Sequence, residues 1–154
     1  MSSATAPTSL RTGHVGLNVT DLDRSTAFYR TLLGLDLAAE GTETGRRYAF
    51  LARDGRLVLT LWQQSTGAFA TAAPGLHHLS FQVDSLDEVR AAEAVLRDLG
   101  AEFTHEGVVP HGEGTASGGI FFTDPDGIRL EIYTPAGLTG TAAPDATAPT
   151  CGFF

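Results

Sequence analysis

Two histidines and one glutamate have the types and spacing needed for a metal site. His14 and His78 lie 64 positions apart, and each opens the same short pattern: His-Val-Gly-Leu-Asn-Val in the first copy and His-Leu-Ser-Phe-Gln-Val in the second. Glu131 lies near the end of the chain in the segment Ile-Arg-Leu-Glu-Ile-Tyr. Imidazole and carboxylate ligands together suit Fe, Mn, Co, Ni and Zn ions. The three side chains therefore predict a divalent metal site.

Each of these residues is expected on a strand, with polar neighbours on its own face. Alternate residues of a strand point to the same side of the sheet. His14 then shares a face with Asn18, and His78 shares a face with Gln82, opposite apolar residues in both cases. Glu131 likewise lies opposite apolar neighbours. If the three polar faces line one cleft, the two imidazoles and the carboxylate converge there.

His77 competes with His78 for the role of ligand. We choose His78 because it aligns with His14, and because each is followed by an apolar, a small and an apolar residue. His77 would point to the other face, where it would pack or meet solvent. A lone strand histidine is usually hydrogen-bonded or half-exposed, and a lone strand glutamate is usually solvated. The metal prediction therefore depends on the repeat.

The elements that must position these residues form two modules of the same order. In module one a helix through Phe28 and Leu32 follows the first strand. In module two the helix begins with the capping box Ser85-Leu-Asp-Glu88, in which both side chains satisfy end amides. A long glycine-rich loop is expected at 104–118. The expected strands are 14–19, 47–52 and 56–62 in module one, and 78–83, 101–103, 119–123 and 128–133 in module two.

The bulk properties exclude several classes of function. A chain of 154 residues is expected to form one domain, and its net charge of −8 argues against nucleic acid and anionic membranes as partners. The single cysteine permits no intrachain disulfide and fits a reducing compartment. The sequence has no secretory signal and no apolar run long enough to span a membrane. A cytoplasmic location is therefore expected.

The termini differ in composition from the centre of the chain. The expected division is a flexible N-terminus at 1–11, one domain at 12–135 (module one at 12–62, a linker at 63–75, module two at 76–135) and a tail at 136–154 rich in Gly, Ala, Pro and Thr. The tail ends in the apolar sequence Cys151-Gly-Phe153-Phe154. Two alternatives are open: a disordered end, or phenylalanines that dock on this domain or a partner chain, over the site.

The motifs together resemble the vicinal oxygen chelate superfamily, which includes glyoxalase I, extradiol dioxygenases and bleomycin-binding proteins. The resemblance covers about 12–135 and is carried by the internal repeat and by the segments Phe28-Tyr-Arg-Thr-Leu-Leu-Gly-Leu35 and Phe122-Thr-Asp-Pro-Asp-Gly127. It implies an α+β fold of two βαβββ modules that form an open, barrel-like cleft, often completed or domain-swapped in a homodimer. It also implies that His14, His78 and Glu131 are the metal ligands.

Thr60 separates this chain from family members with four protein ligands. It takes the place in module one that parallels Glu131 in module two, where those members often have glutamate. A threonine hydroxyl is a poor ligand, although Gln63 or Gln64 could still reach the metal. Two histidines and one carboxylate with open positions suit Fe(II) oxygen chemistry. We therefore favour, narrowly, an extradiol-dioxygenase-like oxidoreductase that binds a small substrate through adjacent oxygens, with Fe(II) preferred to Mn, Ni, Co or Zn.

Such an enzyme also needs a group that moves the substrate's proton. The candidates are His111, in the glycine-rich loop, and Tyr133, two residues beyond Glu131. His111 titrates in the useful range, but an exposed loop histidine without a catalytic role is an equal alternative. Three aromatic residues of module one could form an apolar substrate wall, although strand aromatics are more often core: Tyr48, Phe50 and Trp62.

Other functions remain open. Within the family these are metal-dependent isomerase or lyase chemistry, of the glyoxalase or epimerase kind, and thiol transfer. Thiol transfer ranks lower, because the sequence places no dense set of arginines near the ligands to hold a phosphonate. Outside catalysis, the chain could be a drug-binding protein of the bleomycin-resistance kind, whose clefts usually lack a complete metal triad, or an inactive scaffold.

Overall fold

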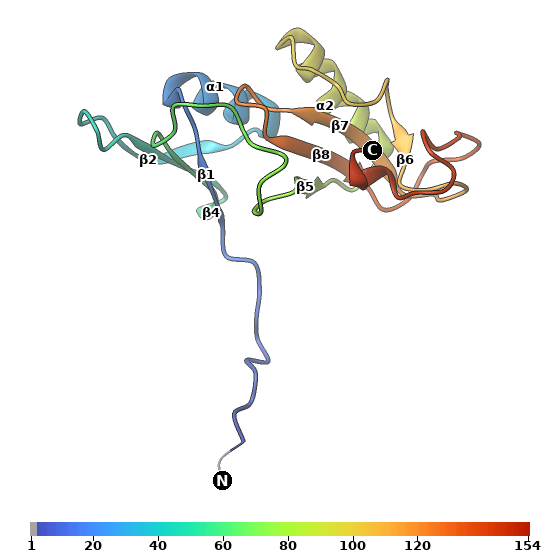
Figure 1. The fold of residues 1–154 in the computed structure, drawn as a ribbon, viewed down its shortest axis with the longest axis horizontal. Helices are drawn as coiled ribbons and strands as arrows, with labels where there is room; N and C mark the ends of the chain where they lie inside the picture. The colour runs from blue at the N-terminus through green and yellow to red at the C-terminus, as the bar shows by residue number, and fades with distance from the viewer. Residues whose placement is uncertain (1–2) are drawn as a thin grey trace.

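The computed structural model describes residues 3–154 and arranges them as two βαβββ modules that lie side by side, with the N-terminal segment extending away from both (Figure 1). The first module contains β1 (Val15–Asn18), α1 (Leu22–Leu33), β2 (Asp36–Gly41), β3 (Tyr48–Arg53) and β4 (Arg56–Trp62). The second contains β5 (Leu79–Gln82), α2 (Leu86–Asp98), β6 (Val109–Pro110), β7 (Gly118–Thr123) and β8 (Arg129–Thr134), and a 3₁₀ helix, η1 (Thr150–Gly152), follows near the C-terminus. The predicted α+β class and module order are confirmed.

Each module builds one four-stranded mixed sheet, in the order β1-β4-β3-β2 for the first sheet and β5-β8-β7-β6 for the second. In both, the first strand of the module pairs in parallel with the last. Gly16 lies opposite Thr60 in the first sheet, and Ser80 lies opposite Glu131 in the second. Thr60 and Glu131 thus hold equivalent positions, as the similar patterns of Leu59–Trp62 and Leu130–Tyr133 predict. The two sheets remain separate over residues 3–154 and form no closed barrel.

Two parts of the strand prediction were wrong. The sequence pattern did not reveal β2, whose residues are mostly exposed and therefore lack a clear alternation. The segment 101–103 was expected to be a strand, but it contributes a single bridge between Phe103 and Phe122. The strand beside β7 is β6, which lies inside the expected loop. Pro110 has no amide hydrogen to donate, so it is tolerated there because β6 is an edge strand.

Capping residues mark both ends of α1 and the start of α2. The Asp21 side chain accepts a hydrogen bond from the backbone N–H of Arg24 at the start of α1. At its end, Gly34 adopts the left-handed conformation with φ of 62°. At the start of α2 the Ser85 hydroxyl accepts from the N–H of Glu88, whose carboxylate accepts from an amide in return. The predicted capping box is therefore present.

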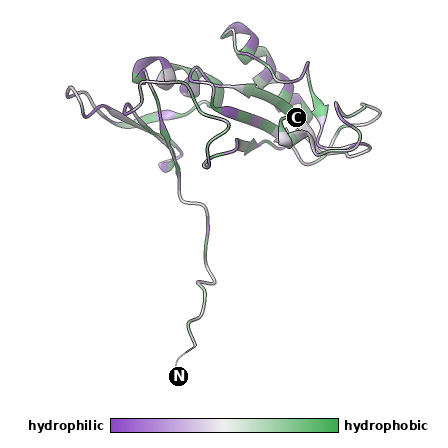
Figure 2. Cartoon of the chain, in the orientation of Figure 1, coloured by the Kyte–Doolittle hydropathy of each residue, from purple (hydrophilic) through white to green (hydrophobic). Residues whose placement is uncertain are grey.

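The two modules share one hydrophobic core. Helix α1 packs on β3 and β4, α2 packs on β7 and β8, and the helices contact each other. Both helices contain a mixture of hydrophobic and hydrophilic residues, as amphipathic helices do (Figure 2). Their apolar sides meet fully buried residues from both sheets, including Leu59, Leu61, Ile120 and Leu130. Within residues 3–154, no helix is long and apolar enough to cross a membrane.

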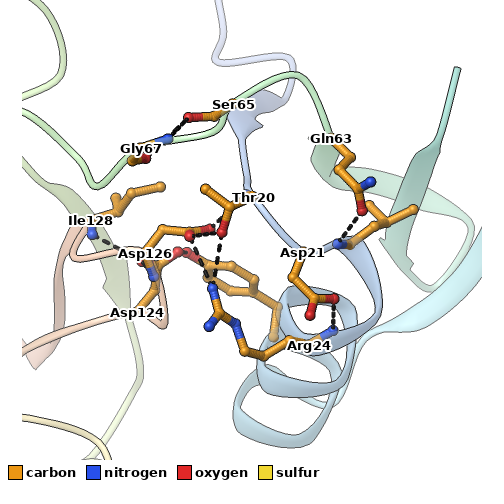
Figure 3. A network of polar contacts seen from close by, with 11 residues as sticks. Thr20, Asp21, Arg24, Gln63, Ser65, Gly67, Asp124, Asp126 and Ile128 are labelled. Carbon is orange, nitrogen blue, oxygen red and sulfur yellow. Dashed lines mark hydrogen bonds and ion pairs between the residues drawn. The ribbon is translucent and has the colours of Figure 1, made fainter. Parts of the chain in front are cut away.

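A network of polar contacts joins the first module to the turn that precedes β8 (Figure 3). The hydroxyl of the buried Tyr29 donates to Asp124 Oδ2 at 2.7 Å. Asp126, in the same turn, accepts from the backbone N–H of Thr20 at 3.1 Å and from Arg24 Nη2 at 3.0 Å. We call these five residues the junction network. Because β8 carries Glu131, the network helps to set where the candidate metal residues lie relative to the first module.

Candidate metal centre

A buried carboxylate lies between two imidazole rings on one face of the second sheet. Glu131 is only 2% exposed. Its Oε2 lies 3.6 Å from Nε2 of His78, and its Oε1 contacts Nε2 of His111. Both imidazoles are about three-quarters buried, since each side chain is 23% exposed. The structure therefore brings together two of the three predicted metal residues and one predicted acid–base residue.

Strand pairing explains why His78 and Glu131 meet. Glu131 lies opposite Ser80, because β5 and β8 pair in parallel. His78 comes two residues before Ser80, so it falls on the same face of the sheet. The opposite face carries Leu130 and Ile132, which are buried in the shared core. The alternation inferred from the sequence therefore places the polar residues as expected in this sheet.

His111 reaches Glu131 from the segment that follows β6. Its backbone N–H donates to the carbonyl of Ser117, and its Nδ1 lies 3.0 Å from the Ser117 hydroxyl. With Nδ1 held there, Nε2 is turned to the Glu131 carboxylate. This contact between Ser117 and His111 could not be predicted from the sequence pattern. It depends on the pairing of Pro110 with Gly118, which places residues from the two sides of the loop beside each other.

Tyr133, the other predicted acid–base residue, lies two residues beyond Glu131 in β8, on the same face of the strand. Its ring centroid is 5.0 Å from that of His111. Its hydroxyl donates to Oε1 of Gln82 at 2.9 Å, which links β8 to β5. Tyr133 therefore borders the candidate site, but its hydroxyl already has a partner.

His14 does not join the other two predicted metal residues within the chain. It is exposed and lies just before β1, at the edge of the first sheet. Among residues 3–154, no group of three His, Cys, Asp or Glu side chains is arranged to hold a metal ion. One chain thus provides His78 and Glu131 as a pair, with His111 beside them, and leaves His14 next to the edge of the other sheet.

The corresponding face of the first sheet is aromatic instead of acidic. Thr60 is 2% exposed, and its hydroxyl accepts from Nε1 of Trp62 at 2.9 Å. The rings of Tyr48, Phe50 and Trp62 pack together with centroids 5.1–5.8 Å apart. Gln63, an alternative ligand, instead accepts from the backbone N–H of Leu22 at the start of α1. This face therefore offers an aromatic surface and no carboxylate.

The donor set around Glu131 fits a divalent cation. A buried carboxylate is costly unless a positive group compensates its charge, and within the described residues only imidazoles approach this one closely. Burial lowers the pKa of His78, and the charge of Glu131 offsets only part of that effect. A lower pKa favours the neutral imidazole, which is the form that binds metals. Carboxylate and neutral imidazole together suit first-row divalent metals.

Comparisons with known proteins agree with the predicted resemblance. The sequence model of the Glyoxalase/Bleomycin resistance protein/Dioxygenase superfamily matches residues 11–132. The uncharacterized protein YaeR of Escherichia coli is 34% identical over 125 residues, which cover 78% of this chain and 92% of YaeR. The catechol-2,3-dioxygenase of Bacillus subtilis is 27% identical over 124 residues, which cover 79% of this chain but only 40% of that enzyme.

Solved structures show the same fold. A glyoxalase/bleomycin resistance protein/dioxygenase domain from a Frankia species superposes with a TM-score of 0.64 and 27% identity, over 86% of this chain and 98% of that one. The fosfomycin resistance protein FosX of Listeria monocytogenes, solved with Mn(II) and sulfate, superposes with a TM-score of 0.60 and 22% identity. That match covers 86% of this chain and 95% of FosX. At this identity the likeness to FosX concerns the fold alone.

Proposed function

The chain belongs to the glyoxalase/bleomycin resistance protein/dioxygenase superfamily, and on that premise we propose that it is a divalent-metal-dependent enzyme acting on a small molecule with adjacent oxygens. The observation that carries the proposal is the environment of Glu131. Its carboxylate is buried, and in the described chain it faces the imidazoles of His78 and His111. An acid in that setting is suited to bind a cation.

The residues of the second sheet would divide the work. His78 and Glu131 would hold the metal. A bound divalent cation supplies Lewis-acid polarisation of substrate oxygens. His111, oriented by Ser117, would accept a proton from a substrate hydroxyl at Nε2, which would be free for this role once the Glu131 carboxylate holds the metal. Tyr133 would border the substrate and keep its hydroxyl on Gln82.

We further propose that a homodimer completes the site, with His14 of the partner subunit as the third ligand. Within the described residues, His14 is exposed, and no three His, Cys, Asp or Glu side chains form a group that could hold a metal ion. It lies just before β1, an edge strand of an open sheet whose aromatic face is only half-buried. A second copy could therefore place His14 beside His78 and Glu131. Such a dimer would also bring the aromatic surface of one subunit to the face of the other that carries His78 and Glu131.

Mixing two inactive variants tests the shared site. His14→Ala and Glu131→Gln each remove one ligand. If ligands come from two subunits, a mixed dimer contains one site in which both residues are intact, and random mixing restores about a quarter of the wild-type sites by the symmetry of the dimer. Metal binding would be measured after unfolding and refolding the mixture. No recovery, in mixtures shown to contain mixed dimers, would refute sharing between subunits.

For the reaction type and the metal, we propose extradiol-dioxygenase-like chemistry with Fe(II). It is supported by the similarity to a catechol-2,3-dioxygenase, although this chain spans only 40% of that enzyme. It is also supported by Thr60, which leaves two histidines and one carboxylate as ligands. The test is anaerobic loading with Fe(II) followed by oxygen-uptake assays on a panel of catechols, with Glu131→Gln as control. Parallel loading with Mn, Ni, Co and Zn, assayed without oxygen, tests isomerase and lyase chemistry.

The aromatic surface of Tyr48, Phe50 and Trp62 favours one second candidate, a drug-binding protein without catalysis. Clustered, half-buried aromatic rings can hold a planar ligand with no metal. Metal analysis of protein purified without chelators separates the two functions. The drug-binding function would be favoured if the protein contains no metal and if His14→Ala leaves ligand binding unchanged. A cytoplasmic location remains a prediction in both cases.

A further inference from the structure

The last residues of the chain are fixed beside the candidate metal centre. Thr150 is 5% exposed, and its backbone N–H donates to the carbonyl of His111 at 2.9 Å. Its hydroxyl donates to the carbonyl of Pro110 at 2.6 Å. These two bonds tie η1 to the segment that carries His111. The tail therefore returns to the second module instead of ending away from it.

Phe153 continues from this anchor onto the residues around Glu131. Its ring centroid lies 5.5 Å from the ring of His78, 6.0 Å from His77 and 5.6 Å from Phe121. The guanidinium carbon of Arg129 lies 5.2 Å from the same ring. Phe121 is directly opposite Glu131 across β7 and β8. Phe153 thus sits against one proposed ligand and against the neighbours of the other.

Two details indicate that this position is specific to Phe153. Its backbone has a φ of 57°, a conformation that is uncommon for a bulky residue and must be offset by favourable contacts. Phe154, the adjacent residue, is 85% exposed. Only one of two identical neighbouring side chains is therefore docked. The contacts are aromatic edges, tilted rings and one cation, and all of them favour a flat ring at this place.

We propose that Phe153 is a tethered occupant of an aryl-binding subsite, and that a substrate with an aromatic ring must displace it to reach the metal. The inference rests on the proposed function, because it takes His78 as a metal ligand. It adds the class of ligand, which is an aromatic ring that carries a negative group. Arg129 makes no ion pair within residues 3–154, so its charge is free to pair with such a group once the phenyl ring leaves.

The tether makes the tail an internal competitor. Its effective concentration at the subsite is set by the chain and does not change with dilution. For a ligand that needs the empty subsite, the apparent Kd equals the intrinsic Kd divided by the fraction of molecules in which that subsite is open. Removing the Phe153 ring should therefore tighten ligand binding without adding any contact, while removing the Phe154 ring should not.

The experiment compares Phe153→Ala with the matched control Phe154→Ala in the full chain. The probe is 2-naphthoate, a fluorescent aromatic acid, titrated into metal-free and Mn(II)-loaded protein. Phe153→Ala should bind it roughly fivefold to tenfold tighter than wild type, the range expected for losing one aromatic competitor. Phe154→Ala should match wild type. Equal affinities in all three proteins, or equal tightening in both variants, would overturn the proposal.

Two further readouts separate this inference from the proposed function. Mn(II) affinity is measured first in all three proteins. If none binds Mn(II), the proposed function fails, and the naphthoate titration of metal-free protein still decides whether Phe153 competes. Arg129→Gln in the Phe153→Ala background should weaken 2-naphthoate binding more than binding of the neutral 2-naphthol. Equal weakening of both ligands would contradict the role of Arg129 in selecting an acid.

Discussion

Replacing Tyr29 with phenylalanine tests whether the junction network holds the two modules together. The Tyr29 hydroxyl is the one hydrogen-bond donor to Asp124 Oδ2 found in the described chain, while Oδ1 accepts from the N–H groups of Asp126 and Ile128. Tyr29→Phe keeps the ring, which is fully buried. It leaves one oxygen of a buried carboxylate without a partner.

The expected loss follows from that single bond. Hydrogen bonds to charged groups contribute roughly 1.5–3 kcal/mol, and an unsatisfied buried acceptor costs a similar amount. Asp124 keeps its two backbone donors, so we expect Tyr29→Phe to lower the free energy of unfolding by about 2 kcal/mol. For a domain of this size that corresponds to a decrease in Tm of roughly 4–8 °C.

The pH dependence provides an independent check. Burial, and then the charge of Asp124, hold the pKa of Tyr29 well above its ordinary value. A folded-state pKa above the unfolded value means that this stabilisation is complete below about pH 10 and is lost as pH rises toward the folded pKa. Wild-type stability should therefore fall about 1.4 kcal/mol per pH unit more steeply than that of Tyr29→Phe above pH 10. The chain has no lysine to obscure this titration.

Urea unfolding at pH 7 and across pH 9–11 measures both effects, with Tyr48→Phe as the matched control. The Tyr48 hydroxyl makes no hydrogen bond within residues 3–154, so its removal should change stability by less than about 0.5 kcal/mol. The reasoning is refuted if Tyr29→Phe is as stable as Tyr48→Phe at pH 7, or if the wild type and Tyr29→Phe lose stability in parallel above pH 10.

Two further variants test the ends of the helices. Ser85→Ala removes the hydroxyl that accepts from the Glu88 amide and should cost about 1 kcal/mol of unfolding free energy; Ser9→Ala, at an exposed position outside any helix or strand, should cost nothing, and equal values would contradict the capping role. Gly34→Ala forces a side chain into a left-handed conformation with φ of 62° and should cost about 1 kcal/mol. Gly13→Ala has open space and no positive φ, so a loss there as large as at Gly34 would refute the conformational argument.

Much of the fold could be predicted from the sequence because its signals are local. The alternation in the strands, the capping box at Ser85 and the repeat of 64 residues each depend on neighbouring residues or on direct alignment. The similar patterns of Leu59–Trp62 and Leu130–Tyr133 also predicted that Thr60 and Glu131 are equivalent, which the strand register confirms. Strand β2 was missed because most of its side chains are exposed, so burial imposes no alternation on them.

The candidate site was only partly predictable, for a physical reason. A repeat shows that His14 and His78 hold equivalent positions in two sheets, but it carries no information about how the sheets face each other. The proximity of His78 to Glu131 depends on pairing within one sheet and could be inferred. The contacts of Ser117 and Phe153 depend on the path of an irregular loop and of the tail, for which no periodic pattern exists.

The most direct test of the account is calorimetric titration of Mn(II) into the wild type and into His14→Ala, His78→Ala and Glu131→Gln, with His105→Ala as control. His105 makes no contact with the Glu131 carboxylate in the described chain. The account predicts one Mn(II) bound per chain, a loss of affinity greater than about tenfold in each of the three ligand variants, and no change in His105→Ala. Binding by Glu131→Gln and His78→Ala that equals wild type would contradict it.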